Sequence, residues 1–442
     1  MNRRILNIAI PSIVSNVIIP LLGLFDLTIA GHLGVTAFIG AVSVGATMFN
    51  LTYWNFGFLR MGTSGMTAQA FGRKDFKESY AILFRSTLTA LFFGLVVIAL
   101  QYPIQWILLK LIGAGAEVQT YVKDYFFVVV WGAPAILATM SMSGWMLGMQ
   151  NSVYPMIVSI SVNVVNIIVS LLCVYSFDMG FIGIAYGTMA AQWFGFLFSI
   201  VLLARLTRKR AISIDLKASI KAVRELHGFS QYSKVNVFIF LRSLCMMLVT
   251  LFFTSAGARS GDLVLAVNAL LMQLYIFYSY FMDGFAFAGE ALVGNYFGAK
   301  DKAEMNRCIR HLFGWGITVM AIFVGGFLMF RDSIIALLTN DAAVIKLATQ
   351  YSLWAALIPM AGMMAFIWDG VFIGLTATKG MFLSLLGGTI SFFTLYFGLP
   401  YIVSADGIFA DRNNVLWMAF LSFLLVRGLV QCVIIPKFNK VD

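Results

Sequence analysis

The side chains best suited to chemistry in this chain are ionisable residues inside long apolar runs. In the first half the clearest is Asp26, which lies deep in an apolar run after Pro11 and Pro20. These prolines remove backbone hydrogen bonds, so we expect a helix that bends near the acid. A buried carboxyl in such a place can take a proton from one side and release it on the other. The alternative is a structural ion pair between Asp26 and Arg60.

Four further ionisable residues stand out in the apolar runs of the second half: Arg242, Asp283, Glu290 and Asp369. Asp283 and Glu290 are two helical turns apart and therefore share one helix face. Two interpretations stay open for this group. The side chains either line a polar surface that meets a ligand, or they lock neighbouring helices together.

Uncharged polar residues recur at helical spacing between these two groups. Asn163 and Asn166 are followed one turn later by Ser170, and Thr188 and Gln192 lie on the next apolar run. Amide and hydroxyl groups in lipid often bridge helices by hydrogen bonds. The alternative is that they line a cavity near the acid of the first half.

Composition decides what kind of molecule holds these residues. Of 442 residues, 61% are hydrophobic and only 11% are charged, and the mean hydropathy is +0.91. An ordinary soluble domain has roughly 25% charged residues, so this chain must face lipid over most of its surface. The sequence therefore predicts an all-α polytopic membrane protein, since the apolar runs are too long for barrel strands.

Twelve apolar runs approach or exceed the roughly 20 residues that a helix needs to cross a bilayer. They span residues 5–31, 38–71, 78–109, 118–146, 154–176, 182–205, 229–257, 262–297, 308–330, 343–372, 379–403 and 414–435. An even number of crossings places both ends of the chain on the same side. Twelve transmembrane helices are therefore expected.

The basic residues orient these helices. The net charge of +11 would indicate a nucleic-acid partner only if it formed a patch on a soluble face. Instead, most of the 30 Lys and Arg residues fall at the chain ends and in alternate loops. By the positive-inside rule, both termini are cytoplasmic and the protein is multi-pass in the plasma (inner) membrane. No nucleic-acid partner is expected.

The chain also repeats itself at a constant offset of 226 residues. Thr28 to Gly31 fall on Thr254 to Gly257, and Phe71 to Asp75 fall on Phe297 to Asp301. The same shift places the small-residue pair Gly144 and Gly148 on Gly370 and Gly374. A shared offset over three segments indicates two homologous halves of six helices each.

The repeat predicts the domain organisation. We expect an N-terminal six-helix bundle over 1–207, a basic cytoplasmic linker with an interfacial helix over 208–228, and a C-terminal six-helix bundle over 229–442. In the linker, apolar residues recur opposite basic ones, as in a helix lying on anionic lipid. Because six is even, the pseudo-symmetric bundles share an orientation and would flank a central cleft that opens alternately to each side.

Enzyme signatures are absent from the sequence. There is no phosphate-binding loop, nucleophile elbow, zinc-protease motif or dinucleotide fingerprint, and His32, His227 and His311 are too scattered for a metal site. We therefore expect no enzymatic activity and no cofactor or metal. Any transport must be driven by an ion gradient or by a separate ATPase.

At these residues the sequence resembles the multidrug and toxic compound extrusion (MATE) family, and within it the DinF branch. The resemblance covers essentially the whole chain, and its most specific segments hold Arg60 and Asp369. The stretches that carry it are Pro20 to Asp26, Ala30 to Leu33, Phe58 to Ala70, Asp283 to Ala286, Glu290 to Gly294 and Trp368 to Gly374.

The resemblance implies an antiporter that exports small amphipathic organic compounds in exchange for H+ or Na+. It implies that Asp26 is the protonation site of the first bundle, with Asn163, Asn166 and Thr188 in the polar cluster around it. Many relatives have an Asp one turn after the second Asn, where this chain has Ser170. The missing carboxylate weakens a multi-ligand cation site, so we favour H+ over Na+.

The resemblance and the buried charges together give the predicted substrate path: Arg60, Asn163, Asn166, Ser170, Thr188, Gln192, Arg242, Asp283, Glu290 and Asp369. The expected partners are organic substrates, the coupling ion and membrane lipids, with the chain acting as a monomer. The main alternative is a flippase for a lipid-linked or otherwise anionic amphipathic substrate, because Arg60 and Arg242 suit phosphate or carboxylate groups. An ion channel fits the repeat less well.

Overall fold

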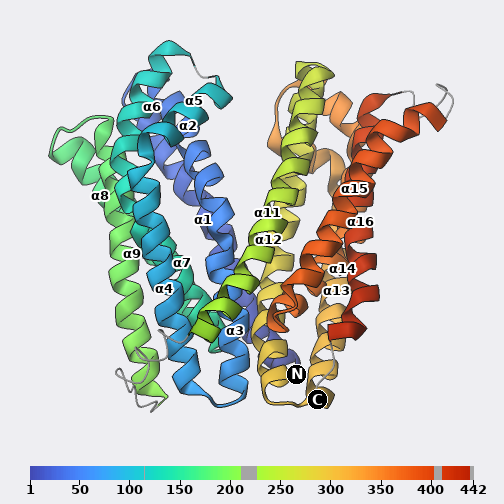
Figure 1. Ribbon diagram of the computed structural model, residues 1–442. Helices are drawn as coiled ribbons and strands as arrows, with labels where there is room; N and C mark the ends of the chain where they lie inside the picture. Colours follow the sequence, from blue (N-terminus) through green and yellow to red (C-terminus); the bar gives the residue numbers. More distant parts are fainter. Residues whose placement is uncertain (114, 211–225, 403–410, 439–442) are drawn as a thin grey trace. The chain divides into compact units, whose positions relative to one another are not determined.

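The computed structural model describes residues 1–442 except 114, 211–225, 403–410 and 439–442. Within the described part the chain is helical almost throughout and has no strand (Figure 1). Eleven helical segments are long and apolar enough to cross a membrane. They coincide with eleven of the twelve predicted runs, which confirms the all-α polytopic prediction.

The remaining run, 38–71, is the second crossing, and it is not one continuous helix. It divides into α2 (Thr36–Trp54), the 3₁₀ turn η1 (Asn55–Gly57) and α3 (Phe58–Gly72). At the break, Asn55 Nδ2 donates to the Leu51 carbonyl 3.3 Å away. A side chain that competes for helix carbonyls, followed by a glycine, favours a local change of helix type.

By internal packing the described chain forms two compact units. The first unit is Ile10–Asn236, and the second is Met1–Ala9 together with Val237–Asp442. Two helices, α1 (Asn2–His32) and α11 (Leu226–Arg259), pass from one unit to the other along their length. The chain passes between the units before Ile10 and after Asn236. The separation of these two positions differs by one residue from the 226-residue repeat, and Pro11 lies just after the first of them.

The first unit is built largely from short or interrupted helices. Two breaks lie within it besides η1: the 3₁₀ turn η2 (Val130–Gly132), which divides one predicted run, and the π segment η3 (Leu172–Ser176), which ends another. Its other helices are α4 (Phe76–Ala99), α5 (Gln101–Ile112), α6 (Ala116–Val129), α7 (Ala133–Gly148), α8 (Val153–Leu171) and α9 (Ile182–Lys209).

The second unit has longer helices, several of which extend beyond the predicted runs. Its central helix α14 is largely buried, and it packs against α12, α13 and α16. Their bounds are α12 (Asp262–Gly298), α13 (Lys302–Leu338), α14 (Ala342–Gly374), α15 (Thr378–Ile402) and α16 (Arg412–Phe438). The predicted interfacial helix falls mainly on 211–225, outside the described residues, and the bundle boundaries at 207 and 229 stay predictions.

The backbone repeats the 226-residue offset in its turns. Asp75 caps α4 by accepting from the Glu78 amide, and Asp301 caps α13 by accepting from the Glu304 amide, both at 3.0 Å. The residue before each cap is a lysine in the left-handed region, with φ of 59° in both halves. A side-chain oxygen at this position satisfies an otherwise unpaired helix amide. The two halves therefore start equivalent helices with the same local chemistry.

The paired glycines repeat in the same way and explain the small-residue motif. A Cβ on Gly144 would collide with the backbone of Arg60, and a Cβ on Gly370 would collide with the backbone of Ala286, the residue at the 226 offset from Arg60. Each pair holds two helices at backbone contact, α7 with α3 and α14 with α12. The glycines are needed because only hydrogen fits between these backbones.

We therefore expect Gly144→Ala and Gly370→Ala each to destabilise the protein by about 1–3 kcal/mol, since backbone cannot move aside as a flexible side chain can. Thermal denaturation of the purified variants in detergent measures this. Gly325→Ala is the matched control, because a Cβ there meets nothing within 4 Å. That variant should be neutral or slightly stabilised by its higher helix propensity. Equal melting of all three variants would contradict the proposed contact.

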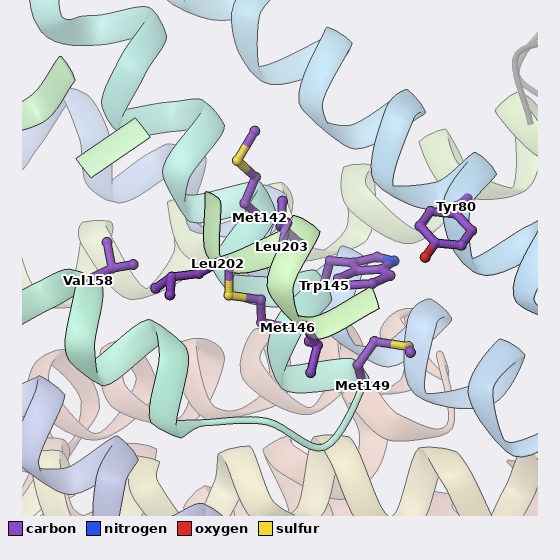
Figure 2. Packing of buried hydrophobic residues seen from close by; sticks show 9 residues of the cluster. Tyr80, Met142, Trp145, Met146, Met149, Val158, Leu202 and Leu203 are labelled. Atoms are coloured by element: carbon purple, nitrogen blue, oxygen red, sulfur yellow. The ribbon is translucent and has the colours of Figure 1, made fainter. Parts of the chain in front are cut away.

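The core of the first unit is rich in methionine around one tryptophan. Trp145 is fully buried, packs against Tyr80 with ring centroids 5.6 Å apart, and donates from Nε1 to the Ser79 carbonyl at 2.9 Å (Figure 2). Met142 and Met146 fill the remaining space beside it. Flexible thioethers fill irregular gaps between helices, so these methionines serve packing. This core fixes α7 against α4, α8 and α9.

Candidate functional site

The first unit places one carboxylate in a small polar cluster. Asp26 on α1 is only 4% exposed. Thr188 on α9 lies beside it, with Thr188 Oγ1 3.3 Å from Asp26 Oδ2, and Asn166 on α8 donates from Nδ2 to the same hydroxyl at 3.1 Å. Three helices therefore converge on the acid. Sequence reasoning placed these three residues in one cluster, and the structure brings them together.

The Thr188 hydroxyl gives this cluster two possible states. It has one hydrogen and two acceptors in reach, Asp26 Oδ2 and the Ile184 carbonyl at 3.1 Å. When Asp26 is charged, the hydroxyl can donate to the carboxylate. When Asp26 is protonated, the hydroxyl can donate to Ile184 and accept from the acid. The hydrogen-bond inventory of these groups therefore suits both protonation states without a backbone change.

The described residues give Asp26 no cationic partner. Its Oδ1 makes no hydrogen bond, and its Oδ2 meets only Thr188. The alternative ion pair with Arg60 is not formed, because the ion pairs within the described residues do not include this acid. Neutralising Asp26 would consequently leave no buried positive charge without a partner. This property distinguishes Asp26 from Asp369 of the second unit, described below.

Three other predicted members of this cluster lie close to it without bonding to Asp26. Ser170 is fully buried against the backbone of Gly187, where a Cβ would collide with its hydroxyl. Asn163 donates from Nδ2 to the Ser159 carbonyl of its own helix at 2.8 Å. Gln192 turns its amide oxygen toward Gly132 in η2. These residues shape the packing between α8, α9 and η2.

One residue of this site escaped the sequence reasoning. Tyr125 on α6 is buried and lies near enough to Asp26 to interact with it electrostatically. Gly45 on α2 makes room for its ring, because a Cβ there would lie 2.6 Å from Tyr125 Cδ1. The sequence held one signal that could have pointed to Tyr125, because the 226-residue offset pairs it with a second tyrosine, Tyr351.

The second unit holds a different kind of charged cluster. Asp369 on α14 accepts from Arg242 on α11 and from Arg427 on α16, both at Oδ2. Its Oδ1 accepts from Gln431 Nε2 at 2.7 Å. All four side chains are buried. The acid is therefore fixed by two guanidinium groups and an amide, and these contacts stabilise its charged form.

Sequence reasoning found Arg242 and Asp369 but did not connect them, and it gave no role to Arg427 or Gln431. Arg427 is 1% exposed and lies over the ring of Phe366, with its guanidinium carbon 5.9 Å from the centroid. The available signal was spacing, because Arg427 and Gln431 are four residues apart and so share one helix face. Of the two interpretations left open by the sequence, these contacts favour the one in which the charged side chains hold neighbouring helices together.

The remaining predicted residues lie elsewhere in their units. Arg60 is half-buried, and its backbone is the surface against which Gly144 packs. Asp283 is half-buried and interacts electrostatically with Tyr275. Glu290 is buried on α12, where its carbonyl faces Gly374.

Comparison with known proteins decides the family. The MatE family model matches the chain twice, over residues 11–172 and 239–398. The chain belongs to the MATE family. The two matches fall one on each half, in agreement with the 226-residue repeat and with the predicted resemblance.

Individual relatives indicate the branch of the MATE family to which this protein is similar. It is 32% identical to the DNA damage-inducible protein F of Escherichia coli K12 over 97% of this chain and 90% of that protein. It is 21% identical to the multidrug export protein MepA of Staphylococcus saprophyticus, over 78% of this chain and 76% of the relative. The chain is thus a DinF-like MATE transporter. These relatives do not favour the flippase alternative.

Solved structures agree on the fold. A crystal structure described as MATE in the bent conformation superposes with a TM-score of 0.86 and 18% identity, over 99% of this chain and 96% of that chain. The eleven apolar segments together with the α2–α3 crossing fit the twelve-helix MATE fold. MATE relatives are transporters and multi-pass membrane proteins.

Proposed function

We propose that this MATE protein is an H+-coupled antiporter of the bacterial inner membrane that exports amphipathic organic compounds by alternating access. Asp26 is the proton carrier. The observation that carries the proposal is the contrast between two of the buried acids: Asp26 has one hydroxyl partner, whereas Asp369 is held by two arginines. Protonating Asp369 would leave two buried cations uncompensated, at a cost that Asp26 does not incur.

The transport cycle follows from the state of the Asp26 cluster. With the carboxylate charged, Thr188 donates to it and a cationic or polarisable cargo is favoured in the same unit. With the carboxyl protonated from outside, that attraction disappears and the cargo leaves. Pro11 and Pro20, both inside α1, weaken its backbone ladder and so permit the helix to bend as the charge changes.

The choice of H+ over Na+ rests on the neutral members of the cluster. Ser170 takes the place of a second carboxylate and packs against Gly187, so Asp26 is the acid of this group. A single carboxylate with hydroxyl and amide neighbours suits the exchange of one proton. Of the other predicted residues of the substrate path, Arg60, Asp283 and Glu290 supply polar contacts to the cargo, whereas Arg242 and Asp369 hold helices of the second unit together.

Transport in proteoliposomes tests the proposal. Purified protein is reconstituted, and the accumulation of a panel of fluorescent amphipathic dyes is followed under an imposed pH gradient, an imposed Na+ gradient, or neither. We expect the pH gradient to drive dye movement at the same rate with and without Na+. Movement driven by Na+ alone would show that the coupling ion is wrong, and no gradient-driven movement would refute antiport.

A further inference from the structure

A basic groove lies beside the N-terminal part of α13 in the second unit, and its walls do not include Asp369. It has a volume of about 680 Å³ and lies between α13 and the first residues of α1. Its walls are Asn2, Arg307, Arg310, His311, Gly314, Trp315 and Thr318. Nothing in the proposed transport cycle uses these residues.

The groove follows one stripe of α13. Arg307, His311, Gly314 and Thr318 recur every three or four residues, so they lie along one helix face. Arg307 and Arg310 are exposed, and among the described residues the acid that forms an ion pair with them is Glu304, 3.2 Å from Arg307. The outer end of the stripe is therefore cationic and open.

The same helix becomes apolar further along. Trp315 stacks on Phe285 with ring centroids 5.9 Å apart, and beyond it Ile317 and Ile322 are 51% and 64% exposed. The most apolar window of α13 is only 17% buried inside the protein, so this helix presents its side chains to lipid. A tryptophan between a basic end and an exposed apolar stretch marks a membrane interface.

We propose that this groove is a binding site for an anionic phospholipid. The phosphodiester lies against Arg307, Arg310 and His311, and the acyl chains run along the exposed apolar surface of α13. A free phosphate would meet the cations but not the apolar stretch. Basic pockets beside transmembrane helices bind anionic headgroups by this chemistry, and each basic residue near the membrane surface strengthens binding about fivefold.

Native mass spectrometry of the full-length protein in detergent tests the site. Phosphatidylglycerol, phosphatidylcholine and inorganic phosphate are titrated separately onto the wild type and onto Arg307→Gln/Arg310→Gln. We expect wild type to prefer phosphatidylglycerol, and the double variant to bind it about 25-fold more weakly. The control Arg331→Gln/Lys346→Gln removes the same charge at the far end of α13 and at the start of α14, and should keep the wild-type affinity.

A second variant separates shape from charge. Gly314→Leu adds a side chain where a Cβ meets nothing within 4 Å, so it fills the groove without disturbing the packing of α13. We expect it to weaken phosphatidylglycerol binding while the cations remain and the melting temperature is unchanged. Equal affinities in wild type and both groove variants would overturn the site. Competition by inorganic phosphate at the same concentration as the lipid would overturn the phospholipid assignment.

Discussion

Asp26→Asn is expected to abolish proton-driven export while the protein still folds and inserts. The amide has the shape of the carboxyl and keeps an acceptor toward Thr188, so the change in stability should stay within about 1 kcal/mol. It cannot take up or release a proton in the working pH range. Dye movement under a pH gradient should therefore fall to the level of liposomes without protein.

Proton release gives a second measurement of the same variant. Adding cargo to wild-type protein in weakly buffered detergent solution should release protons, detected by a pH indicator, and Asp26→Asn should release none. Asp124→Asn is the matched control, since Asp124 lies in the same unit on α6 but is exposed. If correctly inserted Asp26→Asn exported dye at the wild-type rate under a pH gradient, the proton assignment would be wrong.

Apolar run length and the 226-residue offset were enough to predict most of the fold. Twelve runs gave the number of crossings, and the offset anticipated the equivalent caps at Asp75 and Asp301 and the glycine contacts of α7 and α14. The break at Asn55 could not be predicted from hydropathy, because the apolar run continues across it. Such a break depends on one side chain competing for one carbonyl.

The two charged clusters were predictable to different degrees. Asp26, Asn166 and Thr188 were grouped correctly because they match a family pattern on successive helices. The Asp369 cluster needs α11, α14 and α16 to meet, and sequence spacing carries no information about which helices are neighbours in space. The pairing of Arg427 with Asp369 could therefore not be predicted from the sequence.

In the proposed mechanism, Asp26 and Asp369 serve opposite purposes. In the first unit Asp26 has one hydroxyl partner and a second carboxylate oxygen without a hydrogen bond, an arrangement that suits the exchange of a proton. In the second unit the carboxylate joins three helices through two arginines and a glutamine. In the proposed cycle, the proton gradient therefore acts on Asp26 in the first unit, while the Asp369 cluster keeps the second unit together.

The second large effect is expected for the Asp369 cluster, where a substitution should lower the stability of the protein. Asp369→Ala leaves Arg242 and Arg427 buried without their shared carboxylate, and removing one partner of a buried ion pair costs about 3–5 kcal/mol. We expect this variant to lose most of its monodisperse fraction on heating in detergent, under conditions in which Asp26→Asn remains intact. Fluorescence-detected size exclusion after a temperature series measures the difference.

A neutral replacement of the whole cluster distinguishes locking from proton coupling. Asp369→Leu combined with Arg242→Met and Arg427→Met removes all three charges together, and replacing buried ion pairs by apolar residues of similar volume is often neutral or stabilising. The triple variant should regain most of the stability that Asp369→Ala loses. It should also still release protons when cargo binds, because Asp26 is untouched. A stable triple variant without proton release would instead assign the coupling to Asp369, since the lock would be shown to be dispensable and the charge would not.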